Sequence, residues 1–247
     1  MPTAGTAPCI WCWIPCAWTP LGTSRVWVTL GYGILNEVYW PATGLPQIRD
    51  LGFIVAGPSE WFEVKRVNRY HVSMPDDWVP LPQVAHEGDG YRLLIEVLPD
   101  PSRDVVLILY RLTGDNMNLY ALLAPHLSNG GEHNNARAAE DLTAWKDDTA
   151  LCLLSDSGFS RSSAGYVGAS DGWQDFSRNG RMTWEYGEAI DGNVALLGEL
   201  PATQGTLAQS PHMTPKSGRC GCHPGRSRPA WPARAARAGP PYCFAGC

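Results

Sequence analysis

Tyr91-Arg-Leu-Leu-Ile-Glu-Val-Leu98 is the stretch of sequence that decides the fold class. Each of its odd-numbered residues is apolar, whereas Arg92 and Glu96 stand at even-numbered positions. Successive side chains of a strand point to opposite faces of a sheet, so this alternation predicts a half-buried β-strand. The following run, Asp104-Val-Val-Leu-Ile-Leu-Tyr-Arg-Leu112, is nearly continuous in apolar residues and predicts a central strand that is covered on both faces.

The same reading extends along the chain from Ser24 to Leu200, where short apolar segments alternate with turn residues and none sustains helical periodicity for three turns. The 11 Trp and 9 Tyr also favour broad β surfaces. We therefore predict an all-β fold, a large antiparallel β-sandwich of two packed sheets. The other predicted strands are Arg25–Leu30, Ile34–Tyr39, Leu51–Ala56, Trp61–Val67, Leu119–Ala124, Ala150–Leu154 and Val194–Glu199.

The two ends of the chain differ in composition from the middle. The first 20 residues carry three Cys and three Trp without one charged side chain, and residues 201–247 are rich in Pro, Gly, Ala and Arg but contain no Val, Ile, Asp or Glu. Such a composition cannot build a strand core. We predict an atypical segment at 1–23, a sandwich domain at 24–200, and an irregular or disordered tail at 201–247, with a shifted reading frame as a second explanation of both ends.

Charge and hydropathy exclude some classes of partner. Residues 1–200 carry 13 Lys and Arg against 24 Asp and Glu, a net charge of -11, which repels phosphate backbones and argues against nucleic-acid binding. The apolar stretch from Ile10 to Trp18 is interrupted by Pro15 and has no Lys or Arg before it. We recognise neither a signal peptide nor a transmembrane segment there, expect no membrane partner, and leave the compartment open.

Two loops supply the candidate site residues. In Ser170-Asp-Gly-Trp-Gln-Asp175, Asp171-Gly172 favours a tight turn, and Trp173 with Asp171 and Gln174 is a candidate contact for a sugar ring or for a neighbouring domain. His126 and Asn129 belong to a polar cluster that could hydrogen-bond hydroxyl groups, or simply satisfy its own loop backbone. Because the His spacing fits no usual pair of metal ligands, no metal site is predicted.

Other short patterns carry little weight. Gly168-Ala-Ser-Asp-Gly172 matches a nucleophile elbow, but no parallel sheet or following amphipathic helix is expected around it. Gly31-Tyr-Gly33 reads as a turn between strands. Arg49-Asp50 and Arg103-Asp104 read as local ion pairs or turn contacts. No cofactor is predicted.

Seven of the eight cysteines lie in the unusual ends, and Cys152 reads as a core residue. The spacing of Cys9-x-x-Cys12 and Cys220-x-Cys222 fits no familiar zinc finger, although zinc or disulfides remain alternatives for these residues.

Eight phrases, taken in order, resemble the amino-terminal domain of bacterial glucoamylases and glucodextranases, in glycoside hydrolase family fifteen. They are Ser24–Pro41, Gln47–Leu51, Asp100–Val105, Leu122–Gly130, Asn134–Ala136, Ser163–Gly168, Ser170–Asp175 and Asp191–Leu196. The resemblance implies a supersandwich of the galactose mutarotase type, standing before a helical (α/α)6 barrel that performs the hydrolysis.

In that family, the two Glu residues that act as general acid and base belong to the barrel, and the resemblance here ends near Leu200. Inverting hydrolysis needs two carboxyl groups about 6.5–9.5 Å apart, and no such pair is nominated. The resemblance therefore implies a non-catalytic accessory domain of an α-glucan-degrading glycosidase, truncated before its catalytic domain, with α-glucan or that domain as partner. Two alternatives stay open: an independent carbohydrate-binding module using Trp173, and a mutarotase-like enzyme, which would need a His and a carboxylate in one concave pocket.

Overall fold

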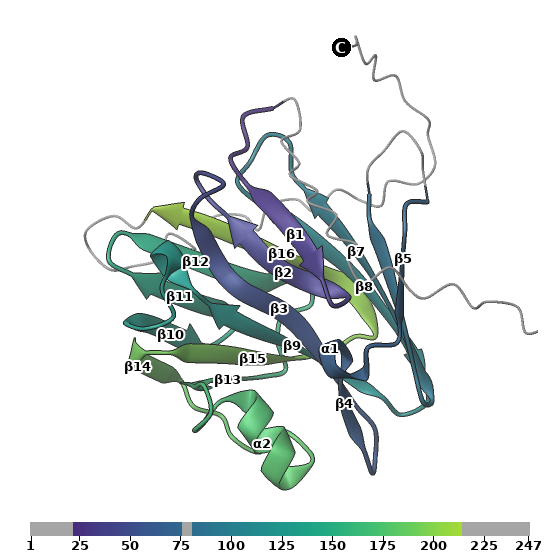
Figure 1. Ribbon diagram of the computed structural model, residues 1–247. Helices are drawn as coiled ribbons and strands as arrows, with labels where there is room; N and C mark the ends of the chain where they lie inside the picture. Colours follow the sequence, from purple (N-terminus) through teal and green to yellow (C-terminus); the bar gives the residue numbers. More distant parts are fainter. Residues whose placement is uncertain (1–21, 76–80, 214–247) are drawn as a thin grey trace, which may run out of the picture.

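The computed structural model describes residues 22–75 and 81–213, and in this part of the chain two antiparallel sheets pack face to face (Figure 1). One sheet has seven strands and the other nine, and neither closes into a barrel. The predicted all-β sandwich is confirmed. The predictions for residues 1–21 and 214–247, including those for Cys9, Cys12, Cys220 and Cys222, lie outside the described residues.

The seven-stranded sheet crosses the front of the molecule in Figure 1. Its order is β1 (Trp27–Gly31), β2 (Ile34–Tyr39), β3 (Pro46–Ala56), β9 (Asn118–Pro125), β15 (Val194–Leu200) and β13 (Arg161–Tyr166), with β4 (Trp61–Glu63) paired to β3. The predicted turn at Gly31-Tyr-Gly33 lies between β1 and β2, where Tyr32 and Gly33 both have positive φ.

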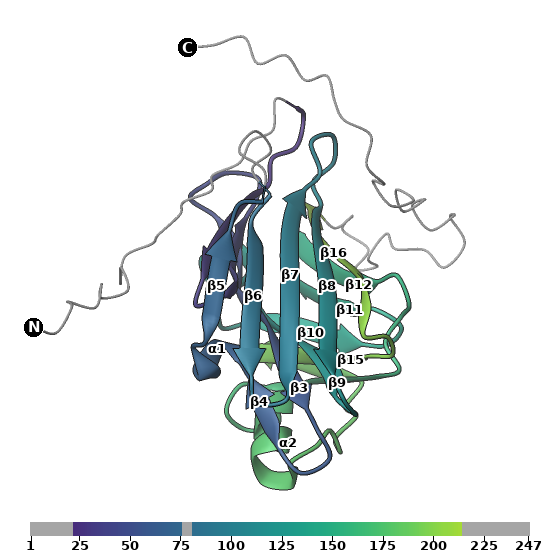
Figure 2. The same cartoon turned by 90° about the vertical axis from the view of Figure 1, so that its right-hand side faces the viewer.

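The nine-stranded sheet forms the second layer, and Figure 2 shows its strands β5 to β8 side by side. Its order is β14 (Glu188–Gly192), β10 (Asn134–Ala138), β11 (Leu142–Lys146), β12 (Thr149–Ser155), β16 (Gln204–Met213), β8 (Val106–Gly114), β7 (Tyr91–Pro99), β6 (Gln83–Gly88) and β5 (Tyr70–Ser73).

The core lies between the two sheets and follows the alternation of the strands. In β7 the odd-numbered residues Tyr91 to Val97 are all buried, as the sequence predicts. In β8 only alternate residues are buried, while Leu109 is 36% exposed, so the prediction that this strand is covered on both faces is wrong. The strand is central within its sheet, but a two-layer sandwich places the opposing sheet against one face only. Cys152 is buried, as predicted.

Strand β16 lies beyond Leu200, so the predicted end of the sandwich at that residue is wrong. Its sequence contains Pro211, which normally argues against a central strand because proline has no N–H to donate. Here β8 pairs with residues 204–209 only, and Pro211 lies beyond that ladder, where only β12 pairs with β16. Strand β16 therefore pairs with both β8 and β12, and its pairing with β8 does not require an N–H group at Pro211.

The described residues form two α-helices, and the first of them corrects a further prediction. The predicted strand Trp61–Val67 divides into β4 and helix α1 (Val64–Val67), which ends at Asn68 in the left-handed conformation. Helix α2 (Gly172–Asn179) lies at the end of the molecule below β13 in Figure 1. Neither helix has the length or the apolar run that a membrane span requires within the described chain.

We expect Leu207→Ala to lower the free energy of unfolding by about 2–5 kcal/mol, because Leu207 of β16 is fully buried between the sheets. Leu109→Ala, on the neighbouring strand β8, is the matched control and should cost less than about 1 kcal/mol, since its side chain faces outward. Urea unfolding monitored by tryptophan fluorescence measures both values. Equal losses for the two variants would contradict this assignment of the inner and outer faces.

Candidate functional site

A recess of about 660 Å³ lies on the outer face of the seven-stranded sheet, beside α2. Its floor is apolar and comes from Leu122 and Ala124 of β9 and Ala195 of β15. These residues alternate along the strands with core residues, so they point away from the sandwich interior. Its polar walls are Asn36, Glu37, Arg49, Asp50, Glu63, Lys65, Arg66, Asp171 and Gln174, with Tyr32, Val167, Gly168 and Trp173 completing the lining.

The amino-terminal end of helix α2 forms one wall of the recess. Asp171 is the residue that caps this end of the helix. The Asp171 carboxylate accepts hydrogen bonds from the backbone N–H groups of Gln174, at 2.9 Å, and Gly168. The tight turn predicted at Asp171-Gly172 is therefore wrong, and so is the expectation that no helix follows the Gly168–Gly172 pattern. The sheet around this pattern is nevertheless antiparallel, and the Ser170 hydroxyl accepts a hydrogen bond from the backbone N–H of Tyr166, so no nucleophile elbow is present.

Gly172 lets α2 approach the sheet closely. A Cβ atom at this position would lie 2.6 Å from a side-chain carbon of Leu197, which is closer than packed carbon atoms approach. Phe176, one turn further along, is fully buried and its ring lies 4.9 Å from that of Tyr120. The helix is thus fixed against the outer face of β9 and β15, at one end of the recess.

Trp173 is held between neighbours within this wall. The guanidinium of Arg66 lies 4.3 Å from the centre of the Trp173 ring system, and the Trp61 ring meets it edge-on at 6.0 Å. The indole Nε1 atom is buried without a hydrogen-bond partner. One ring face is therefore already occupied by Arg66, which leaves less of Trp173 open to a flat ligand than the sequence suggests.

The carboxylates of the recess are also engaged. Asp50 forms an ion pair with Lys65, with 2.7 Å between the charged atoms, and Glu63 forms one with Arg66 at 2.6 Å. Glu37 accepts a hydrogen bond from the Tyr39 hydroxyl, and burial, together with this bond and the nearby negative charge, raises the pKa of Tyr39 to about 12. Each acidic group of the recess therefore already has a donor.

Local ion pairs or turn contacts are the two alternatives that the sequence leaves open for Arg49-Asp50 and Arg103-Asp104. The ion pairs between these sequence neighbours are wrong, and a local turn contact is confirmed for Arg103. Asp50 pairs with Lys65 rather than Arg49. Asp104 pairs with Arg25, and Arg103 pairs with Asp100. Lys65 and Arg25 come from distant segments, whereas Asp100 lies three residues before Arg103 in the loop between β7 and β8.

His126 and Asn129 do not line the recess. His126 precedes and Asn129 ends the turn Leu127–Asn129 after β9, where the N–H of Ser128 donates to the Gln47 side chain at 3.1 Å. The pKa of His126 is lowered by burial and by the nearby charge of Arg49. The structure thus brings Asp171, Trp173 and Gln174 together and leaves His126 and Asn129 apart, and a contact role for any of the five stays a prediction.

Sequence reasoning missed the basic and aromatic side of the recess, which comes from Tyr32, Lys65 and Arg66. The pair Lys65-Arg66 lay within an expected strand, and only the helical turn of α1 places both residues at the recess. No group of three potential metal ligands occurs within the described residues.

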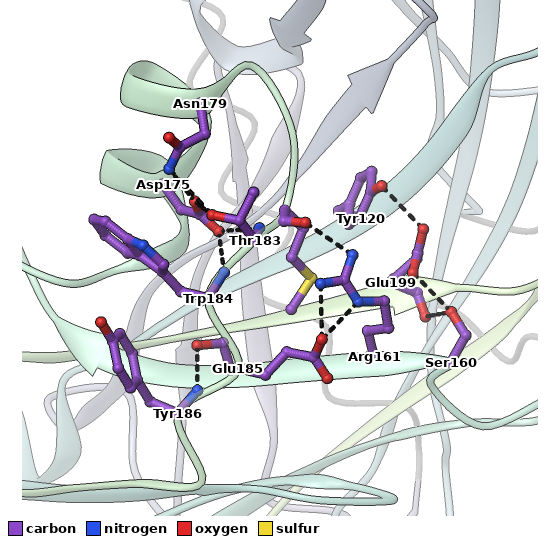
Figure 3. A network of polar contacts seen from close by, with 12 residues as sticks. Tyr120, Ser160, Arg161, Asp175, Asn179, Thr183, Trp184, Glu185, Tyr186 and Glu199 are labelled. Carbon is purple, nitrogen blue, oxygen red and sulfur yellow. Dashed lines mark hydrogen bonds and ion pairs between the residues drawn. The ribbon is translucent and has the colours of Figure 1, made fainter.

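Asp175 is the centre of a second polar network, next to the recess (Figure 3). Its buried carboxylate accepts hydrogen bonds from the backbone N–H groups of Thr183 and Trp184 at 2.6 and 2.7 Å, and from the Thr183 hydroxyl and the Asn179 amide at 2.6 and 2.8 Å. Burial alone would raise the pKa of Asp175, but these donors outweigh it and lower the pKa. The carboxylate ties α2 to the segment 181–187 that leads into β14.

We expect Asp175→Asn to lower the free energy of unfolding by about 3 kcal/mol at pH 7, because an amide cannot accept all four hydrogen bonds. The native pKa lies below the unfolded value of about 3.9, so this stabilisation is complete above that pH and is lost as the pH falls through the native pKa. Urea unfolding from pH 7 to pH 2 should therefore show the two proteins converging under acid conditions.

Asp191→Asn is the control for this measurement, since the side chain of Asp191 is 70% exposed and its ion pair with His133 is a surface contact. It should change the stability by less than about 0.5 kcal/mol. A stability difference for Asp175→Asn that is independent of pH would rule out the charged carboxylate as its cause.

The fold and the recess together define the class of the molecule, a two-sheet antiparallel supersandwich domain with a helix-walled recess on its smaller sheet. The chain belongs to the family described as glucodextranase, domain N, whose model matches residues 4–213. The resemblance found in the sequence is confirmed, and the match extends beyond the predicted domain limits at both ends.

Two relatives illustrate the membership. Over 184 residues the chain is 28% identical to the glucoamylase of Clostridium sp. (strain G0005). This alignment covers 69% of this chain and 26% of the relative. A crystal structure of a bacterial glucoamylase complexed with acarbose matches with a TM-score of 0.74 and 24% identity, over 77% of this chain and 31% of that chain, and shows the shared fold. This chain therefore spans less than a third of the length of either relative.

Proposed function

We propose that this chain is the non-catalytic accessory domain of a glycosidase that breaks down α-glucans, and that its recess face docks onto the catalytic domain. The observation that carries the proposal is the alignment of the chain, as a glucodextranase domain N, with 26% of a glucoamylase. The remainder of that relative has no counterpart here.

The chemistry of the recess supports a non-catalytic role. Glycoside hydrolysis by two carboxyl groups needs one to donate a proton to the leaving oxygen and another to act as base or nucleophile. In the recess Asp50 and Glu63 are ion-paired, and both carboxylate oxygens of Asp171 accept backbone hydrogen bonds. A substrate would have to displace these partners before either reaction step.

The composition of the recess supports docking to a protein. Tyr32 at its rim is 61% exposed, and Trp173 carries a buried N–H without a partner. Arg66 lies over Trp173, and Trp, Tyr and Arg are the residues that most often anchor protein interfaces. An apolar floor with a charged rim is the usual anatomy of such a contact.

The two alternative functions gain less support. A mutarotase-like mechanism needs a His beside a carboxylate in a concave site, and none of the described residues that line the recess is a His. A carbohydrate-binding module centred on Trp173 needs an open ring face, and Arg66 already covers one.

A chimera tests the docking. Residues 22–213 of this chain replace the aligned part of the clostridial glucoamylase, and Tyr32→Glu is introduced at the recess rim. We expect the substitution to lower the Tm of the chimera by about 5 °C, because a charge would be placed in the domain contact. Leu109→Glu, on the outer face of the other sheet, is the matched control and should leave the Tm unchanged.

An assay of glucose release tests the non-catalytic role, and it compares the chimera with the 247-residue chain alone. The 247-residue chain should release no glucose from soluble starch, whereas the chimera should. Glucose release by the chain alone would refute the accessory role, and equal Tm values for the Tyr32→Glu and Leu109→Glu chimeras would refute the recess as the contact.

A further inference from the structure

Segment 181–187, between α2 and β14, presents two aromatic rings at the surface. The Trp184 and Tyr186 rings lie 6.0 Å apart, with 44° between their planes. Figure 3 shows both side chains on one side of the segment, while Glu185 reaches to the other side toward Arg161. Tyr186 is 45% exposed and Trp184 is half-buried. Neither residue lines the recess.

The segment is rigid although it is not a helix or a strand. The backbone N–H of Trp184 donates to Asp175, and the Tyr186 backbone donates to the Ser163 hydroxyl at 3.1 Å and accepts from the N–H of Ala164 at 2.8 Å. Arg161 adds hydrogen bonds to Glu185 and to the carbonyl of Met182 (Figure 3). The backbone that carries both rings is therefore fixed before any ligand arrives, which lowers the entropy cost of binding.

Arg178 supplies hydrogen-bond donors next to the two rings. The guanidinium of the exposed Arg178 lies over the Trp184 ring, 5.4 Å from its centre, so it covers part of one ring face and places hydrogen-bond donors at the edge of the aromatic surface. Rigid aromatic faces with adjacent donors are a binding surface for sugars, whose rings carry C–H groups on their faces and hydroxyl groups on their edges.

The geometry points to a binding platform for α-glucan on Trp184 and Tyr186, with one glucose ring stacked on the exposed Tyr186 ring, the next glucose unit against the open part of the Trp184 ring, and Arg178 donating to hydroxyl oxygens. The 44° angle between the rings selects a curved chain, because α-linked glucose units turn relative to one another, whereas β-1,4-linked units extend as a flat ribbon. The choice of α-glucan rests on the proposed function. The platform would hold substrate beside the catalytic domain rather than cleave it.

Native gels containing soluble starch, dextran or hydroxyethyl cellulose test this platform on the 247-residue chain. We expect retardation by the two α-glucans and none by the β-glucan. Tyr186→Ala should weaken the retardation by starch about tenfold, because a stacked aromatic ring of a binding hot spot is lost. Tyr70→Ala, which removes a tyrosine that is 37% exposed on β5 and does not line the recess, is the matched control and should bind like the unmodified chain.

Tyr186→Ala keeps the backbone hydrogen bonds of the segment, so the fold should survive, and an unchanged Tm confirms this. Trp184→Phe retains a ring in the half-buried position and should give an intermediate loss. The inference is overturned if starch and dextran fail to retard the chain, if Tyr186→Ala binds as well as Tyr70→Ala, or if hydroxyethyl cellulose retards the chain as strongly as starch does.

A lower Tm of the chimera on Tyr186→Ala, without glucan binding by the chain, would instead assign the rings to a protein contact and overturn the platform. The chimera carrying Tyr32→Glu reports on docking alone. Failure of the platform and failure of the proposed accessory role are therefore distinguishable.

Discussion

The backbone ladder of β16 is the constraint on which the rest of the sandwich depends. The nine-stranded sheet consists of two four-stranded halves, β14-β10-β11-β12 and β8-β7-β6-β5, and β16 is the strand that joins them. Residues 204–209 pair with β8 and residues 207–213 with β12. Only the joined sheet is broad enough to cover the inner face of the seven-stranded sheet, whose outer face carries the recess.

Local pattern in the sequence predicts the strands that pack by simple alternation. The odd-numbered apolar residues of Tyr91–Leu98 predict β7 correctly, and the predictions for β2 and β15 agree closely with the structure. Strand β13, with the sequence Arg161-Ser-Ser-Ala-Gly-Tyr166, gives no such signal because small and polar residues replace the apolar ones. It becomes a strand by pairing with β15, and no local pattern encodes that distant partner.

In the candidate site, too, local sequence predicts some residues, whereas others come together only through the fold. The phrase Ser170–Asp175 is informative by itself, because a capping Asp and a Trp lie close together in sequence, and the structure places both at the recess. Arg66 reaches the same place from a segment about a hundred residues earlier, which no spacing rule could reveal. The backbone at Trp184 and Tyr186 is fixed by tertiary hydrogen bonds, among them those to Asp175 and Ser163.

The order of the strands along the chain has a consequence for synthesis. The chain passes repeatedly from one sheet to the other, and its last described strand fills the gap at the middle of the larger sheet. During synthesis on the ribosome, the edges of β8 and β12 that pair with β16 would stay unpaired until residues beyond 200 have emerged. Proteins dominated by such long-range pairings fold slowly and expose aggregation-prone edges meanwhile. The yield of folded protein should thus depend on translation rate and chaperone capacity as much as on the stability of the finished sandwich.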